Sequence, residues 1–164
     1  MDTNITMIMK TLQLDYYHLG ILPVTPEVQE ATHDFVLGDE ERLAKRLAES
    51  CGGSTLNVGL TLSERLMEVS SSQRAVRAPL ELQALLSTAS CVMLYHLPIL
   101  FHPELQLNVF RLLLQMSRSI PIIALLPCRY DERWVWYAEP GHSEYQRHAR
   151  EDLYIIQAAT DNVA

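Results

Sequence analysis

Two long apolar runs in the chain show no alternation of polar and apolar residues. They span residues 91–95 and 120–126. Strands of a parallel sheet are covered on both faces, so they lack the alternation of a half-exposed strand. The segment between them, 104–116, is apolar on nearly every side and predicts a deeply packed helix. Because parallel strands need such a crossover, the sequence indicates an α/β fold.

Shorter patterned segments complete the expected order of elements. A strand at 35–37 ends at Gly38, and a helix over 39–50 follows with Leu43 and Leu47 four residues apart. The other predicted elements are a short helix from Pro26, a strand at 54–59, helices at 62–69 and 79–89, and strands at 134–137 and 153–156. We therefore expect a mostly parallel sheet with flanking helices and an antiparallel or edge extension at the C-terminal end.

The length of 164 residues suits one domain with a single core. Residues 1–33 predict a helical or irregular N-terminal segment, because Gly20, Pro23 and Pro26 are typical of turns. The domain itself is expected over 34–158, followed by a short tail at 159–164.

The net charge of −7 is concentrated in residues 1–41, which hold eight acids and one base. Eleven of the thirteen basic residues are arginines, and six of these fall within 111–150. Because a guanidinium makes forked contacts with carboxylate or phosphate, this half could meet an acidic partner. The alternative is that these arginines are ordinary solvated surface.

The cysteines and the apolar content favour a cytoplasmic chain with reduced thiols. Cys51, Cys91 and Cys128 are widely spaced and form no C-x-x-C pair. The first ten residues lack the basic start of a secretory signal. The longest stretch without charged side chains, 82–103, contains two histidines and two prolines, so we expect no membrane span.

The expected nucleotide site lacks its usual residues. In a parallel sheet, phosphates commonly bind where the first strand turns into its helix. The predicted turn at 37–43 has one glycine and no lysine, serine or threonine, and Asp39, Glu40 and Glu41 occupy its first helical turn. These acids could cap the helix instead of binding phosphate. The strand at 91–97 also ends without the carboxylate that would hold magnesium.

Three stretches carry a resemblance to a known family: LNVGLTLSERL at 56–66, LYHLPILFHPELQLN at 94–108 and YAEPGHSEY at 137–145. Together they resemble the small P-loop protein of bacteriophage-exclusion (BREX) defence systems, over roughly residues 35–157. The resemblance implies a P-loop NTPase-like fold and partners that include a DNA methyltransferase and a large ATPase. This chain would be a degenerate member, since the glycine-rich loop is shortened to 38–40 and the acidic motif has become YHLP at 95–98.

The strongest candidates for partner contact lie between 129 and 145. Trp134, Trp136 and Ala138 would share one face of a strand. The two tryptophans could pack the hairpin onto the sheet, fill a protein interface, or stack the bases of a single nucleic-acid strand next to Arg129 and Arg133. The full set of partner-contact candidates is Arg129, Arg133, Trp134, Trp136, Glu139, His142 and Tyr145.

Nothing in the sequence predicts a catalytic, cofactor or metal site. Four histidines, at 96, 102, 142 and 148, lack the paired short spacings of a structural zinc site, and there is no G-x-S-x-G turn. We therefore expect a non-catalytic scaffold or regulatory subunit of an anti-phage defence complex, with self-association left open and DNA contacted only indirectly. The alternatives are a subunit that lends Arg118 or Arg129 in trans to a partner ATPase, and a nucleic-acid-binding accessory module.

Overall fold

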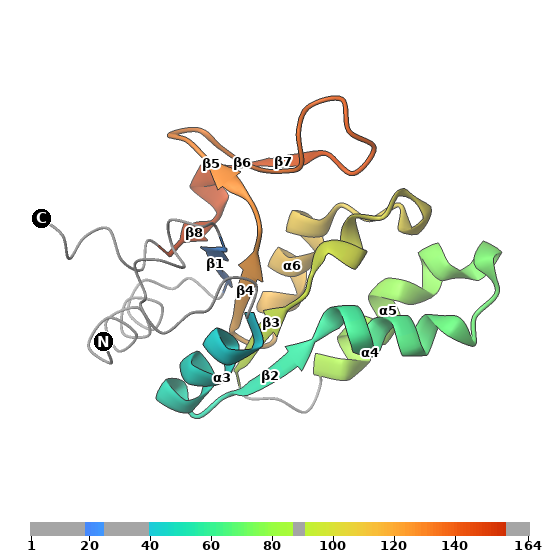
Figure 1. The fold of residues 1–164 in the computed structure, drawn as a ribbon, viewed down its shortest axis with the longest axis horizontal. Helices are drawn as coiled ribbons and strands as arrows, with labels where there is room; N and C mark the ends of the chain where they lie inside the picture. The colour runs from blue at the N-terminus through green and yellow to red at the C-terminus, as the bar shows by residue number, and fades with distance from the viewer. Residues whose placement is uncertain (1–18, 25–39, 87–90, 157–164) are drawn as a thin grey trace, which may run out of the picture.

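A computed structural model describes residues 19–24, 40–86 and 91–156 of the chain (Figure 1). Its larger sheet has five parallel strands in the order β2-β3-β4-β1-β8. Their bounds are β1 Leu19–Pro23, β2 Ser54–Asn57, β3 Val92–Tyr95, β4 Ile122–Leu126 and β8 Tyr154–Ile155. A smaller antiparallel sheet, β5-β6-β7, is formed by Arg129–Tyr130, Trp134–Tyr137 and Gln146–Ala149. The expected mostly parallel sheet with flanking helices and a C-terminal extension is confirmed, and of the two alternatives for the extension the structure shows an antiparallel sheet.

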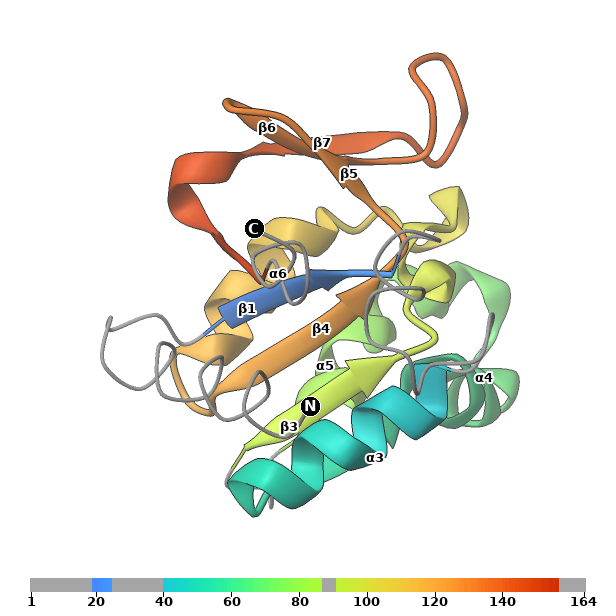
Figure 2. The same cartoon turned by 60° about the vertical axis from the view of Figure 1, so that its left-hand side comes forward.

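Helices cover both faces of the parallel sheet. Helix α3 (Glu40–Cys51) packs on one face, where its residues Leu43 and Leu47 share a buried cluster with Met93. The helices α4 (Val58–Met67), α5 (Arg74–Leu86) and α6 (Val109–Ser117) pack on the other face in a second cluster. Figure 2 shows α3 in front of the sheet and α5 and α6 behind it. The two faces explain why β3 and β4 lack polar alternation.

Strand β1 lies inside the sheet, between β4 and β8, although the sequence analysis expected no strand in residues 1–33. Gly20 and Pro23 suggested turns, but Gly20 pairs with Ile123 within the sheet. Pro23 is the last residue of the strand, where its missing N–H costs little. The expected helix from Pro26 and strand at 35–37 lie outside the described residues.

Three helix predictions differ from the structure. Helix α4 begins at Val58, four residues before the predicted start at 62, so β2 ends two residues before the end of the predicted strand at 54–59. The predicted helix over 104–116 is divided, because a short 3-10 helix at Pro103–Leu105 ends at Gln106 in the left-handed conformation (φ 52°). Helix α6 then begins after Asn108, whose side chain caps it by accepting a hydrogen bond from Arg111 N at 3.2 Å. Helix α5 begins five residues before the predicted start and contains Pro79, since burial of Ala78, Leu82 and Leu86 stabilises it across the proline.

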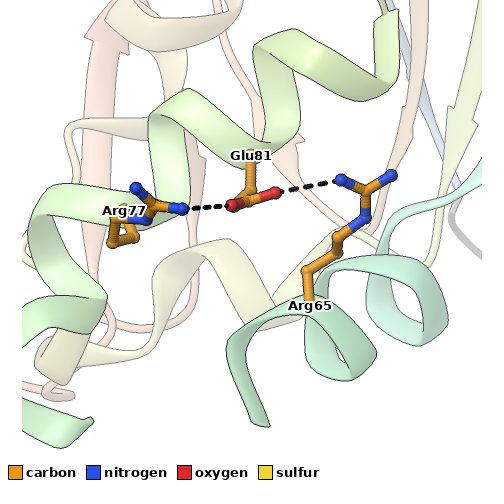
Figure 3. A network of polar contacts seen from close by, with 3 residues as sticks. All are labelled: Arg65, Arg77 and Glu81. Carbon is orange, nitrogen blue, oxygen red and sulfur yellow. Dashed lines mark hydrogen bonds and ion pairs between the residues drawn. The ribbon is translucent and has the colours of Figure 1, made fainter. Parts of the chain in front are cut away.

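A network of charged side chains joins α4 to α5 (Figure 3). Glu81 accepts hydrogen bonds from Arg65 at 3.1 Å and from Arg77 at 3.0 Å. Both arginines are about half exposed, whereas the Glu81 side chain is only 15% exposed. This network fixes the helix pair. None of the described helices is long and apolar enough to span a membrane.

Candidate functional site

At β2 and β3, groups of the chain itself approach the carboxyl edge of the parallel sheet, which is where α/β folds usually bind ligands. Glu40, the first residue of α3, accepts a hydrogen bond from the backbone N–H of His96 at 3.0 Å. His96 follows β3 in the left-handed conformation (φ 54°). A Cβ added to Gly59 would lie 3.0 Å from the carbonyl oxygen of His96, so α4 also approaches this turn closely. A carboxylate and two backbone segments therefore occupy the edge at β2 and β3.

Tyr95, the last residue of β3, is affected by charges of both signs. Burial raises the pKa of Tyr95 and the Glu41 carboxylate raises it further, whereas Lys45, which pairs with Glu41 at 3.1 Å, acts in the opposite direction. Asn57 ends β2 and caps α4 by accepting a hydrogen bond from Leu60 N at 3.0 Å. The net effect of these surroundings is to stabilise the neutral phenol. No group of three residues suited to holding a metal ion occurs within 19–24, 40–86 and 91–156.

The predicted turn at 37–43 lies partly outside the described residues. In the described part, β1 ends at Pro23 and α3 begins at Glu40, so residues 24–39 separate these two elements. This segment still has one glycine and no lysine, so it contains no phosphate-binding motif. Glu40 contacts the end of β3, whereas the sequence analysis expected the acids to cap their own helix. Asp39 lies outside the described residues.

The small sheet lies above α6 in the view of Figure 1. The side chains on its inner face include Val135, which is fully buried, and Tyr137. The ring of Tyr137 stacks on Phe101 with a centroid separation of 3.8 Å. Burial raises the pKa of the Tyr137 phenol, and the charge of the Glu144 carboxylate raises it further. These residues attach the small sheet to the helices of the main core.

Gln146 provides a polar attachment at the start of α6. Its Oε1 accepts a hydrogen bond from Val109 N at 2.9 Å, and its Nε2 donates to Leu107 O at 2.7 Å. Val109 is the first residue of α6, so its N–H has no partner inside the helix. One amide side chain therefore satisfies two backbone groups and fixes β7 against this helix.

The outer face of the small sheet carries tryptophan and arginine. The pairing of the strands aligns Arg129 with Trp136 and Trp136 with Arg147, so these three side chains form one row across β5, β6 and β7. Trp134 lies on the same face two residues before Trp136. The guanidinium of Arg147 sits over its ring, 4.1 Å from the centroid. We call Arg129, Trp134, Trp136 and Arg147 the outer face.

The outer face is accessible and lacks carboxylates. Arg129 and Arg147 are exposed, and both tryptophans are partly exposed. None of the residues in β5, β6 or β7 is acidic. Among the described ion pairs, none involves Arg129 or Arg147. The described contacts that pack the hairpin onto the core come from the inner face.

The hairpin tip between β5 and β6 is fixed by Asp131. Its Oδ1 accepts hydrogen bonds from Arg133 N and Trp134 N, both at 2.8 Å. These backbone donors hold the pKa of the Asp131 carboxyl below its ordinary value. Arg150 donates a hydrogen bond to Asp131 O at 2.7 Å. The tip therefore places Arg133 at the end of the hairpin, where it is exposed.

The remaining predicted contact residues lie in the connection between β6 and β7. Glu139 and His142 are exposed and Tyr145 is partly exposed. His142 N donates to Glu139 O at 3.0 Å, and Tyr145 N donates to His142 O at 3.0 Å. The connection thus has its own turns and follows the C-terminal end of β6.

Arg147 was not among the predicted site residues, although the sequence analysis counted it within the arginine-rich half. Its position beside Trp136 depends on strand register, which the sequence does not show. Arg118 caps α6 and precedes β4, whereas Arg129 follows β4. The two arginines considered for action in trans therefore lie at opposite ends of that strand.

A groove of about 540 Å³ lies between α5 and α6. Its walls include Leu80, Gln83, Leu112 and Met116. No cluster of charged or nucleophilic side chains lines it, so it offers no chemistry of its own.

Comparison of the chain with models of known families, with curated proteins and with solved structures finds no match.

Proposed function

We propose that the chain is a non-catalytic interaction subunit whose partner-binding surface is the outer face. The observation that carries the proposal is the row Arg129–Trp136–Arg147, which is accessible and makes no ion pair among the described residues. Tryptophan and arginine are the side chains most enriched in the energetic centres of protein interfaces. Since the core does not use these side chains, a partner accounts for them better than folding does.

The same proposal includes that the chain neither binds nor hydrolyses ATP. The P-loop NTPase-like fold suggested by the family resemblance is compatible with a first strand inside a parallel sheet. The connection after β1 has no phosphate-binding sequence, and the Glu40 carboxylate occupies the end of β3. A bound triphosphate would have to approach these carboxylates without the glycine-rich loop and the lysine that such a loop carries.

The resemblance to the BREX family suggests which assembly the subunit joins. We propose an anti-phage defence complex in the cytoplasm, with the DNA methyltransferase or the large ATPase as the direct partner. The protein would act there as a scaffold or regulator and would contact DNA only through its partners.

The experiment is purification of tagged protein from the native host. We expect the methyltransferase or the ATPase to co-purify with the wild type and to be lost with Trp136→Ala. The matched control is Met67→Ala, which removes an apolar side chain that is 77% exposed on α4. Equal recovery of both partners with Trp136→Ala would overturn the assignment of the surface. Calorimetric titration with ATP and magnesium should give no binding heat, and saturation at micromolar ATP would overturn the loss of the nucleotide site.

A second candidate function rests on Arg129 alone. Its exposed guanidinium follows the carboxyl end of β4 and could reach the phosphates of a nucleotide held by a partner. Arg129→Ala would then lower the ATPase rate of that partner by at least ten-fold, whereas Arg118→Ala would not. An unchanged rate with Arg129→Ala excludes this function.

A further inference from the structure

We infer that the outer face binds a protein segment bearing two carboxylates, which Arg129 and Arg147 contact on either side of Trp136. This inference rests on the proposed function and names the chemistry of the partner. It follows from three features of the small sheet: the spacing of the two arginines, the support of one guanidinium by an aromatic ring, and the acidic residues that bound the face.

The spacing of the arginines defines the ligand. Arg129 and Arg147 lie on the two strands that flank β6, and both are in register with Trp136. Neighbouring strands are about 4.8 Å apart, so the two Cα atoms are separated by about 10 Å. In an extended segment, side chains two residues apart point to the same side and lie about 7 Å apart. Two acidic residues separated by one other would therefore face the two guanidinium groups together, and the long glutamate and arginine side chains can cover the remaining distance.

Arg147 is already held in a suitable orientation. Its guanidinium lies 4.1 Å from the centroid of the Trp134 ring. Stacking on the ring uses the face of the guanidinium and leaves its N–H edge available for a forked contact with a carboxylate. Because the side chain is ordered before binding, less conformational entropy is lost when the partner arrives.

The surroundings of the face favour a short acidic segment over a nucleic-acid strand. Asp131 and Glu132 lie before the start of β6, and Glu139 follows its end; all three are exposed. Along the direction of β6, the outer face is therefore about 13 Å long, the length of four extended residues. A nucleic-acid backbone would bring further phosphates against these carboxylates, and the net charge of −7 gives it no long-range attraction. A peptide needs only two charges at the face.

The test uses the full chain and three synthetic probes. Fluorescence anisotropy measures binding of a labelled peptide with sequence Gly-Glu-Ala-Glu-Gly, of the same peptide with both glutamates replaced by glutamine, and of a labelled thymidine octanucleotide. We expect binding of the glutamate peptide with a weakening of at least five-fold in Trp136→Ala and in Arg147→Gln. Arg118→Ala, which removes an exposed arginine far from the outer face, should bind like the wild type. Thermal melting of each variant separates loss of binding from loss of folding.

Each other outcome overturns the inference. These are no binding of the glutamate peptide up to 1 mM, equal binding of the glutamine peptide, binding that survives both outer-face substitutions, and binding of the octanucleotide in place of the peptide. The proposed function is tested separately, because co-purification that depends on Trp136 can persist when the peptide does not bind. If co-purification depends on Trp136 but the glutamate peptide does not bind, the outer face is still the partner interface and carboxylates are excluded as its ligand.

Discussion

Gln146→Ala tests how the small sheet is held on the body of the protein. The substitution removes the acceptor for Val109 N and the donor to Leu107 O. A hydrogen bond inside a protein contributes a net 0.5–1.5 kcal/mol, roughly, so the two together predict a loss of about 2 kcal/mol. With a urea dependence of about 2 kcal/mol per molar, the unfolding midpoint should fall by about 1 M.

Two control variants make this measurement specific. Gln146→Glu keeps an acceptor for Val109 N but sets a carboxylate oxygen against Leu107 O, so its midpoint should fall below that of the wild type at pH 7 and recover in part at pH 4, where the carboxyl can donate. Gln115→Ala replaces an exposed glutamine on α6 and should change the free energy of unfolding by less than about 0.5 kcal/mol. A midpoint for Gln146→Ala within about 0.2 M of the wild type would refute the reasoning. The small sheet would then be held by the Tyr137–Phe101 stack and by Val135.

Three further predictions concern single side chains. Glu81→Ala breaks both contacts with Arg65 and Arg77. The free energy of unfolding in urea should fall by about 0.5–1.5 kcal/mol at low salt and by less at 1 M sodium chloride, because salt screens the charges. An equal loss at both salt concentrations would show that charge is not the cause. Burial raises the pKa of the Cys128 thiol to about 12, so a disulfide reagent at pH 8 should leave this cysteine unmodified in the native protein and modify it in urea, as mass spectrometry would show. The pKa of Asp131 is lower in the folded chain than in the unfolded one, so its contribution to stability is present above the ordinary aspartate pKa and is lost as pH falls through the folded value. The melting temperature of Asp131→Asn should therefore fall less steeply than that of the wild type below about pH 4, and parallel curves would contradict this.

The two central strands could be predicted because their signal is local. Residues 91–95 and 120–126 are apolar without alternation, and the structure places β3 and β4 there with helices over both faces. Strand β1 was missed for a physical reason that is not local. Its five residues include Gly20 and Pro23, and only pairing with β4 and β8 holds them extended. Long-range pairing therefore overrode the local preference for a turn.

The candidate site was predicted in part, because its aromatic residues are adjacent in sequence and its arginines are not. Alternation along β6 placed Trp134 and Trp136 on one face, as the structure has them. Arg147 joins them only through the register of β7, which is set by a connection of eight residues with its own turns. Glu139 and His142 were predicted from the sequence block around them and lie in that connection, beyond the strand that carries the tryptophans.

The strongest argument for a partner is that one face of the small sheet packs on the core and the other does not. Val135 and Tyr137 already supply the apolar contacts that join the sheet to α6 and Phe101. Two tryptophans on the opposite face add nothing to those contacts, and each leaves part of a large apolar ring in water, which is unfavourable for an isolated chain. Arg129 and Arg147 beside them gain no ion pair among the described residues. We therefore propose that a partner, and not the fold, accounts for these side chains, and the arginines beside the aromatic rings favour an acidic ligand.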